Sequence, residues 1–165
     1  MIIVIMGVTG CGKSTIGKLL AQKLSLPFIE ADEFHSKENI AKMSSGTPLN
    51  DEDRYPWLQS LSQQLQSHEK TGAILACSAL KESYREILQK DLNEKIIWIY
   101  LEGNETTLQK RLESRTGHFM PGTLLKSQLE VLEKPGDAYR FSIEKDPGTI
   151  THEILNTIKN NPGTH

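Results

Sequence analysis

The chain has little cysteine, few aromatic residues and no long apolar run. Its two cysteines, Cys11 and Cys77, match neither a disulfide framework nor a metal-ligand motif, so we expect both to be reduced thiols. No stretch approaches the roughly 20 apolar residues that a membrane helix needs. The apolar run at 2–6 is short and has no basic flank before it, which argues against a signal peptide. We therefore expect a cytoplasmic protein with no membrane partner.

An excess of charge of either sign is also missing. Nineteen basic and 21 acidic residues give a formal net charge of −2. Such a balance creates no global field that would recruit nucleic acid or anionic lipid. A length of 165 residues, of which 37% are hydrophobic, suits one domain with a real core. The sequence thus predicts a single domain over residues 1–165 and no nucleic-acid partner.

What the chain does contain is a phosphate-binding loop. Residues 7–14 read GVTGCGKS, a full match to GxxxxGK[ST], between an apolar β-branched run and a helical pattern. Its glycines let backbone N–H groups turn inward, and the helix beginning near Lys13 directs its N-terminus at the same anion. Lys13 is expected to reach the β- and γ-phosphates, and the Ser14 hydroxyl to ligate Mg²⁺. The predicted nucleotide-binding residues of this loop are Gly7, Thr9, Gly10, Cys11, Gly12, Lys13, Ser14 and Thr15. Cys11 is either a small tolerated residue or a thiol acidified by the helix N-terminus.

Apolar runs and helical patterns alternate along the rest of the chain. Strands are expected at 2–6, 27–31, 73–77, 96–101 and, with the weakest pattern, 139–143. Helical patterns follow Lys13 and recur at 36–43, 50–65, 82–89, 108–112, 125–132 and 150–158. The alternation predicts an α/β, three-layer P-loop NTPase fold with a central five-stranded parallel sheet flanked by helices. Ligands of such sheets bind beyond the carboxyl ends of the strands, where the P-loop, Asp32 and Ser78 fall.

A P-loop alone does not separate a kinase from a GTPase switch or a motor. The chain has no N-K-x-D or T-K-x-D guanine-reading element and no D-x-x-G switch element after a strand, and it is too short for a motor's extra modules. A small-molecule kinase is therefore the leading class. A kinase of shikimate or of a nucleoside monophosphate shares the fold, and a non-catalytic nucleotide-binding regulator is the alternative from another class.

Six sequence blocks in one order make the chain resemble the gluconokinases of the shikimate-kinase-like and nucleoside-monophosphate-kinase-like P-loop group. They are MGVTGCGKST at 6–15, ADEFH at 31–35, KMSSGTPLNDEDRYPWL at 42–58, ACSALKESYR at 76–85, GHFMP at 117–121 and SQLEVLEKP at 127–135. The blocks at 42–58 and 76–85 would be unexpected in the other kinases of the group. The resemblance implies a homodimer that uses ATP and Mg²⁺ to phosphorylate the primary hydroxyl of D-gluconate, giving 6-phospho-D-gluconate.

Asp32 is the predicted catalytic base. The attacking group is a primary alcohol, which needs a carboxylate that accepts its proton and orients it. A helix N-cap or turn carboxylate is the structural alternative, and Asp32 could also hold a metal-bound water together with Ser14. Such kinases commonly carry an aspartate two residues earlier, where this chain has Glu30. The longer carboxylate could shift a water-mediated metal contact.

A sugar acid presents a carboxylate and several hydroxyls, which call for cations and hydrogen-bonding groups. Arg54, Lys81 and Arg85 are the predicted cations, with a solvated surface position as the ordinary alternative for Arg54. Arg85 lies one helical turn beyond Lys81. The other predicted substrate contacts are Asp32, His35, His118 and Gln128. Packing or an exposed helix face is the alternative for His35 and Gln128, and Trp57 is expected in the core.

Arg111 and Arg115 flank a predicted mobile lid at about 111–124. Their spacing places both on one helical face, and an arginine over the phosphates neutralises charge as the phosphoryl group transfers. In the related fold the first commonly stacks on adenine while the second reaches phosphate. Both are therefore predicted to be catalytic, and Arg111 also to bind nucleotide. The alternative is surface charge paired with Glu105 or Glu113. Lid closure would exclude the water that competes for the phosphoryl group.

Overall fold

Five parallel strands form one central sheet. The computed structural model describes residues 1–115 and 123–161. The strands are β1 (Ile2–Met6), β2 (Phe28–Glu30), β3 (Ala73–Ala76), β4 (Ile97–Glu102) and β5 (Tyr139–Ser142). Their order in the sheet is β2-β3-β1-β4-β5, and every neighbouring pair is parallel. The predicted five-stranded parallel sheet is therefore confirmed.

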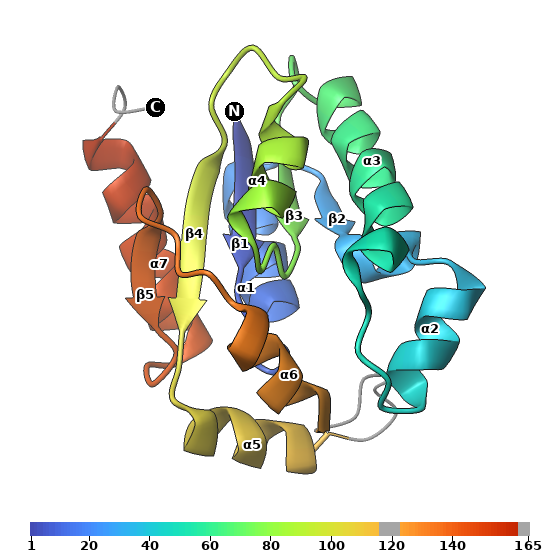
Figure 1. Cartoon of the computed structure of the whole chain (residues 1–165). Coiled ribbons are helices and arrows are strands. Elements are labelled where there is room, and N and C mark those ends of the chain that lie inside the picture. Colours follow the sequence, from blue (N-terminus) through green and yellow to red (C-terminus); the bar gives the residue numbers. More distant parts are fainter. Residues whose placement is uncertain (116–122, 162–165) are drawn as a thin grey trace.

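Helices cover both faces of this sheet. α1 (Lys13–Leu24) and α7 (Pro147–Asn160) lie side by side on one face, whereas α3 (Asp51–Ser67) and α4 (Glu82–Gln89) cover the other (Figure 1). The result is the predicted three-layer α/β architecture. None of the helices in the described ranges is long and apolar enough to span a bilayer.

The core lies between the sheet and these helices. Every residue of β1 and β3 is buried, as expected for central parallel strands with helices on both faces. The helices contribute apolar residues at helical spacing, so each buries one face against the sheet. The buried helix positions include Ile16, Leu20, Leu58, Leu61, Leu65, Leu88, Ile150 and Ile154.

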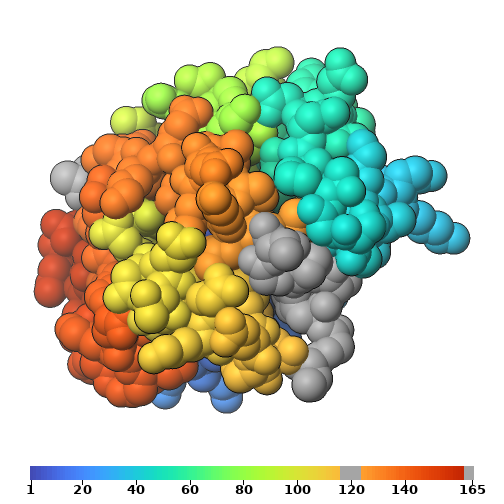
Figure 2. Space-filling view, turned by 60° about the horizontal axis from the view of Figure 1, so that its bottom comes forward, coloured from blue at the N-terminus to red at the C-terminus, as the bar shows by residue number. Residues whose placement is uncertain are grey.

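Shorter helices lie at the carboxyl ends of the strands. A 3₁₀ turn (Ala31–Phe34) and α2 (Lys37–Ser44) follow β2, and α5 (Glu105–Glu113) follows β4. α6 (Thr123–Val131) lies beside α5, below the strand arrowheads in Figure 1 and on the face turned toward the viewer in Figure 2. Of the predicted lid, residues 116–122 lie outside the described residues. The described part of that range is the end of α5, the residues that follow it and the start of α6.

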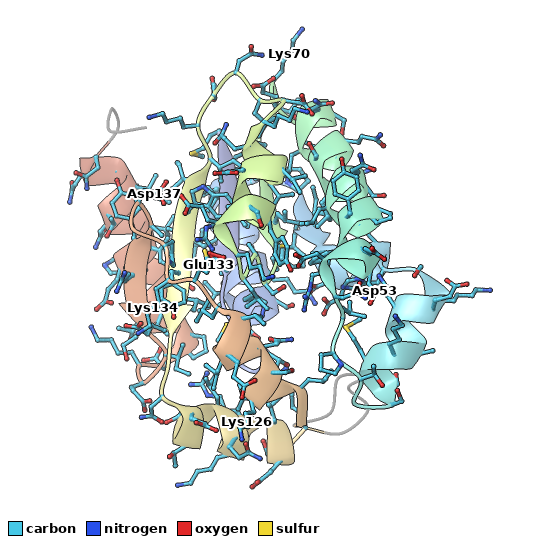
Figure 3. The ribbon with its side chains drawn as sticks, viewed as in Figure 1. Asp53, Lys70, Lys126, Glu133, Lys134 and Asp137 are labelled. Atoms are coloured by element: carbon cyan, nitrogen blue, oxygen red, sulfur yellow. The ribbon has the colours of Figure 1, made fainter. Side chains whose placement is uncertain are left out.

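The start of α3 is fixed by a capping box. The Asn50 side chain accepts the Asp53 N–H at 2.7 Å, and the Asp53 carboxylate accepts the Asn50 N–H at 3.0 Å. Asp53 also pairs with Lys42 of α2 at 2.9 Å, which ties the two helices together where Figure 3 labels Asp53. This junction sets the position of the first turn of α3, which carries Arg54.

Candidate active site

A cavity of about 640 Å³ lies at the carboxyl ends of β1, β2 and β3. Most of the predicted site residues meet there. The lining residues are Thr9, Gly10, Gly12, Lys13, Ser14, Thr15 and Lys18 from the P-loop and α1; Glu30, Asp32, Glu33 and His35 after β2; and Met43, Leu49, Arg54, Trp57, Ser78, Arg115 and Gln128 from the other walls. The sheet edge therefore brings the phosphate loop and the acidic segment after β2 into one space.

The P-loop has the backbone of an anion cradle. Gly10 and Gly12 have φ angles of 82° and 95°, in the region that favours glycine. Gly12 is the N-cap of α1, no side chain caps that helix, and its first turn has no acidic residue. The first N–H groups of α1 thus suit a phosphate. The Lys13 ammonium remains beside the loop, donating to the Val8 carbonyl oxygen at 3.0 Å.

Two residues of the predicted nucleotide set shape the loop instead of lining the cavity. A side chain on Gly7 would place its Cβ 2.9 Å from the Leu101 carbonyl oxygen and 2.7 Å from the Cys11 Sγ, so only glycine fits. Cys11 itself is 2% exposed. Its burial favours the interpretation as a small tolerated residue over that of an accessible thiol.

Glu30 and Asp32, at the end of β2 and just after it, line the cavity together with the P-loop Ser14. The Ser14 hydroxyl donates a hydrogen bond to Glu30 Oε2. Burial raises the pKa of Glu30, the Ser14 hydrogen bond opposes that effect, and the Asp32 carboxylate adds to it. Within residues 1–115 and 123–161, no hydrogen bond or ion pair engages the Asp32 carboxylate.

Of the two structural alternatives for Asp32, a helix N-cap or a turn carboxylate, the N-cap is wrong, and the position within a turn is compatible with a role in the site. The N-cap of α2 is Ser36, whose Oγ accepts the Asn39 N–H at 3.1 Å. Asp32 lies within the 3₁₀ turn and lines the cavity. Its carboxylate is thus available to a ligand.

The oxygen atoms of Ser14, Glu30 and Asp32 are of the kind that Mg²⁺ prefers. Among the described residues, no group of three or more His, Cys, Asp or Glu side chains is arranged so that it could hold a metal ion. A magnesium ion here would therefore need oxygen ligands from water and from a bound phosphate, as is usual for this ion.

His35 and Trp57 form a flat wall of the cavity. Their rings stack with centroids 4.2 Å apart and planes 15° from parallel. Trp57 is 4% exposed, as expected for a core residue, and its indole N–H donates to the Ala31 carbonyl oxygen at 2.7 Å. Burial lowers the pKa of His35 to about 4; the Arg54 charge adds to this and the Asp32 carboxylate opposes it. His35 is therefore a neutral imidazole near pH 7, able to donate or accept a hydrogen bond.

Only one of the three predicted substrate cations lines this cavity. Arg54 Nη1 donates to the Leu49 carbonyl oxygen at 2.7 Å and to the Tyr84 hydroxyl at 3.2 Å. Lys81 instead borders a neighbouring hollow of about 520 Å³, which Arg54 also lines, and pairs with Asp51 at 3.0 Å. Arg54 therefore lines both spaces, whereas Lys81 lines the neighbouring hollow and not the main cavity.

Arg85, predicted as a substrate ligand, does not line the cavity. Its side chain is 8% exposed and donates to two backbone oxygens, those of Ala79 at 2.8 Å and Glu133 at 3.1 Å. Glu133 follows α6 and is labelled in Figure 3. The guanidinium thus joins the end of α6 to the loop after β3. Arg85 lies one helical turn after Lys81, and at that position it faces the buried side of α4.

The two arginines predicted around the lid do not share a helix face. α5 ends at Glu113, so Arg115 lies beyond its last turn, and the four-residue spacing does not apply. Arg115 lines the cavity. Arg111 does not; its Nη2 donates to the Ile143 carbonyl oxygen at 2.6 Å. His118 lies outside the described residues.

Gln128 lines the cavity, but its described partner is the P-loop. Its Oε1 accepts the Thr9 N–H at 2.8 Å. The lining residues that the sequence had not indicated as part of the site include Lys18, Glu33, Met43 and Leu49, and also Trp57, which was expected in the core. Lys18 lies one helical turn after Ser14, a spacing that could have indicated it. Met43 and Leu49 could not have been indicated by their sequence pattern, because they look like ordinary core residues.

Comparisons with known proteins agree with this arrangement. A family model described as Shikimate kinase matches residues 9–146. A probable gluconokinase of Xenopus tropicalis is 44% identical, over 93% of this chain and 91% of the relative. The thermosensitive gluconokinase of Escherichia coli (strain K12) is 44% identical, over 94% and 86%.

Solved structures give the same grouping. The crystal structure of a gluconokinase from Sinorhizobium meliloti 1021 has a TM-score of 0.87 at 41% identity, covering 96% of this chain and 91% of that one. A shikimate kinase from Aquifex aeolicus has a TM-score of 0.69 at 20% identity, with 98% of each chain covered. The second likeness shows the shared fold alone.

Proposed function

Since the chain belongs to the gluconokinase family, we propose that it transfers the γ-phosphoryl group of ATP to the primary hydroxyl of D-gluconate, giving 6-phospho-D-gluconate and ADP. The observation that carries the proposal is the single cavity lined both by the P-loop and by the Asp32 carboxylate, which has no partner among the described residues. A phosphate donor and a proton acceptor in one space are what phosphoryl transfer to an alcohol requires.

The P-loop is the proposed nucleotide site. Backbone N–H groups of Gly10, Gly12 and the first turn of α1 face the phosphates, and Lys13 and Arg115 supply positive charge. Arg111 is also proposed to contact the nucleotide, because its Nη1 lies 3.9 Å from the point where a Cβ on Gly12 would stand. Its Nη2 bond to the Ile143 carbonyl oxygen holds it there. Thr9 and Thr15 complete the lining of the loop.

The oxygens of Ser14, Glu30 and Asp32 fit magnesium. We assign Ser14 as the residue that would ligate the ion directly, and the two carboxylates as groups that would hold its water ligands. Magnesium bound with the nucleotide supplies charge neutralisation on the phosphates. Glu30 is already positioned for this role, because it accepts the Ser14 hydroxyl proton in a hydrogen bond.

Asp32 is the proposed base. It accepts the proton of the primary hydroxyl while the new O–P bond forms and the bond from the γ-phosphorus to the leaving oxygen of ADP breaks. Arg54 holds the carboxylate at the other end of the substrate, and the neutral imidazole of His35 bonds a hydroxyl. Lys81 contributes positive charge from the neighbouring hollow. Gln128 acts on the P-loop through Thr9.

The remaining proposals come from the sequence and the family resemblance. They are closure of a lid over residues 111–124, with His118 contacting substrate, a homodimer and a cytoplasmic location. Each is open to direct measurement, the assembly by light scattering and the His118 contact by kinetics of His118→Ala.

The proposed function is tested by ADP release with ATP and Mg²⁺ against D-gluconate, shikimate, AMP and other aldonates. We expect turnover of D-gluconate, with a product that 6-phosphogluconate dehydrogenase oxidises, and none in the variant Lys13→Ala. Turnover of shikimate or AMP instead would refute the acceptor but keep the kinase. Tight ATP binding without turnover of any acceptor would favour a regulator.

A further inference from the structure

Arg54 is held through one of its three side-chain nitrogens. Its Nη1 donates to Leu49 and to Tyr84, so both Nη1 hydrogens are used. Among the residues that the structure describes, Nε and Nη2 have no acceptor. These two nitrogens form one edge of the guanidinium plane. Parallel N–H groups on one edge are the geometry that binds both oxygens of a carboxylate.

Tyr84 fixes the direction of this contact from the neighbouring helix α4. Its single hydroxyl proton is donated to Asp51 Oδ1, so the bond with Arg54 must run from Nη1 to the phenolic oxygen. Asp51 is held in turn by the Lys81 ammonium at 3.0 Å. The Tyr84 side chain is 4% exposed, which keeps the ring from turning away into solvent.

The Tyr84 ring also contacts both cations. The Arg54 Cζ lies 5.5 Å and the Lys81 Nζ 5.6 Å from the ring centroid, within reach of a cation–π interaction. Lys81 is bound to Asp51 outside the main cavity, whereas Arg54 lines it. Tyr84 thus supports both Arg54, which lines the main cavity, and Lys81, which does not.

We propose that Tyr84 is a specificity-determining positioning residue, whose hydroxyl holds Arg54 so that its Nε–Nη2 edge receives the carboxylate of a sugar acid. The inference rests on the proposed function, which supplies the carboxylate. Tyr84 does not line the cavity, so it acts through Arg54. A neutral polyol has no group that needs this edge, and the network therefore selects an anionic acceptor.

The variant Tyr84→Phe keeps the ring and removes the hydroxyl. We expect the KM for D-gluconate to rise about tenfold, in line with the loss of one hydrogen bond to a charged group, while kcat and the KM for ATP change by less than about twofold. The matched control is Tyr100→Phe. Tyr100 is also buried, its ring lies 5.9 Å from the Arg140 Cζ, and it lines neither cavity. Its substitution should leave the KM for D-gluconate unchanged.

A double-mutant cycle separates positioning of Arg54 from a general structural role. In an Arg54→Lys background there is no guanidinium edge to orient, so Tyr84→Phe should raise the KM for D-gluconate no further. An equal rise in both backgrounds, or no rise in the wild-type background, would overturn the inference. If Tyr84→Phe does not fold, Asp51→Asn tests the same network. Asp51→Asn should raise the KM for D-gluconate by less than Tyr84→Phe, and this rise should vanish in the Arg54→Lys background. A rise that persists there overturns the inference. A wild-type protein inactive on D-gluconate but active on another acceptor would instead refute the proposed function.

Discussion

The side-chain oxygen of Gln128 accepts a hydrogen bond from the backbone nitrogen of Thr9, 2.8 Å away and 119 positions earlier in the chain. The bond joins α6 to the P-loop and is buried. A buried N–H that loses its acceptor costs more than the bond itself contributes. Gln128 therefore acts on the shape of the phosphate loop.

Replacement of Gln128 by leucine keeps much of the side-chain volume and removes the acceptor. We expect the free energy of unfolding to fall by about 1–3 kcal/mol and the KM for ATP to rise several-fold. Urea unfolding and steady-state kinetics measure the two effects. Gln89→Leu is the matched control, because Gln89 Oε1 accepts the Ile96 N–H at 2.8 Å away from the cavity. The Gln89→Leu variant should lose stability while its KM for ATP stays constant. Equal KM values for ATP in the two variants would contradict the role of Gln128.

Asp32→Asn tests the base. The amide keeps the size of the side chain but accepts a proton far less readily, so kcat should fall by about 10²–10⁴-fold. ATP binding, measured by calorimetry, should persist, because the P-loop is unchanged. A kcat within a few-fold of wild type would rule out proton transfer to Asp32.

Asp53→Asn serves as the control for that variant. Asp53 belongs to the capping box of α3 and pairs with Lys42, and it does not line the cavity. Its substitution keeps an oxygen that can accept the Asn50 N–H but removes the charge that pairs with Lys42, so the free energy of unfolding should fall slightly, with little change in kcat. The pair of variants thus distinguishes catalysis from loss of a carboxylate outside the cavity.

His35 makes stability depend on pH. Burial lowers its folded-state pKa from 6.5 to about 4, so between these values the unfolded chain binds a proton that the folded chain does not. The His35 titration therefore leaves the free energy of unfolding unchanged above pH 6.5 and lowers it as the pH falls from 6.5 toward 4. His35→Phe keeps a flat ring against Trp57 and removes the titration. The stability of wild type relative to this variant should fall by up to about 1.4 kcal/mol per pH unit through this window. Parallel curves from urea unfolding across the window would exclude the effect.

The fold was largely predictable because its signals are local. The continuous apolar run at 2–6 and the glycines of the P-loop require a buried strand followed by a phosphate-binding turn, and both are present. Alternating strands and helices then leave a parallel sheet as the simplest arrangement. Strand boundaries differed by at most one residue, as at β3, expected to end at 77 and ending at Ala76. The helices α5 and α7 begin three residues before the apolar patterns that indicated them.

The site was predictable only in part because side-chain direction depends on tertiary packing. Arg54 and Arg85 both follow the pattern of a cation near a strand end or helix start, yet one lines the cavity and the other is buried against Ala79 and Glu133. Nothing in the local sequence of α4 shows that backbone oxygens of the loop after β3 and of the segment after α6 will meet the Arg85 side chain. The role of Tyr84 was likewise hidden, since its partners Asp51 and Arg54 lie 33 and 30 residues away.

Arg111 and Arg115 allow a direct test of which arginine acts on the phosphates. Arg115 lines the cavity, so Arg115→Ala should lower kcat by about 10³-fold, the loss expected for an arginine that neutralises the transferring group, with little change in the free energy of unfolding. Arg111→Ala removes the bond to the Ile143 carbonyl oxygen and should lower stability by about 1–3 kcal/mol, while kcat falls far less. Single-turnover kinetics and urea unfolding of both variants measure the contrast. If Arg111→Ala lost the greater part of kcat at unchanged stability, the assignment would be reversed, because the Arg111 guanidinium, whose Nη1 lies 3.9 Å from the Cβ position of Gly12, would then be the one that acts on the phosphates.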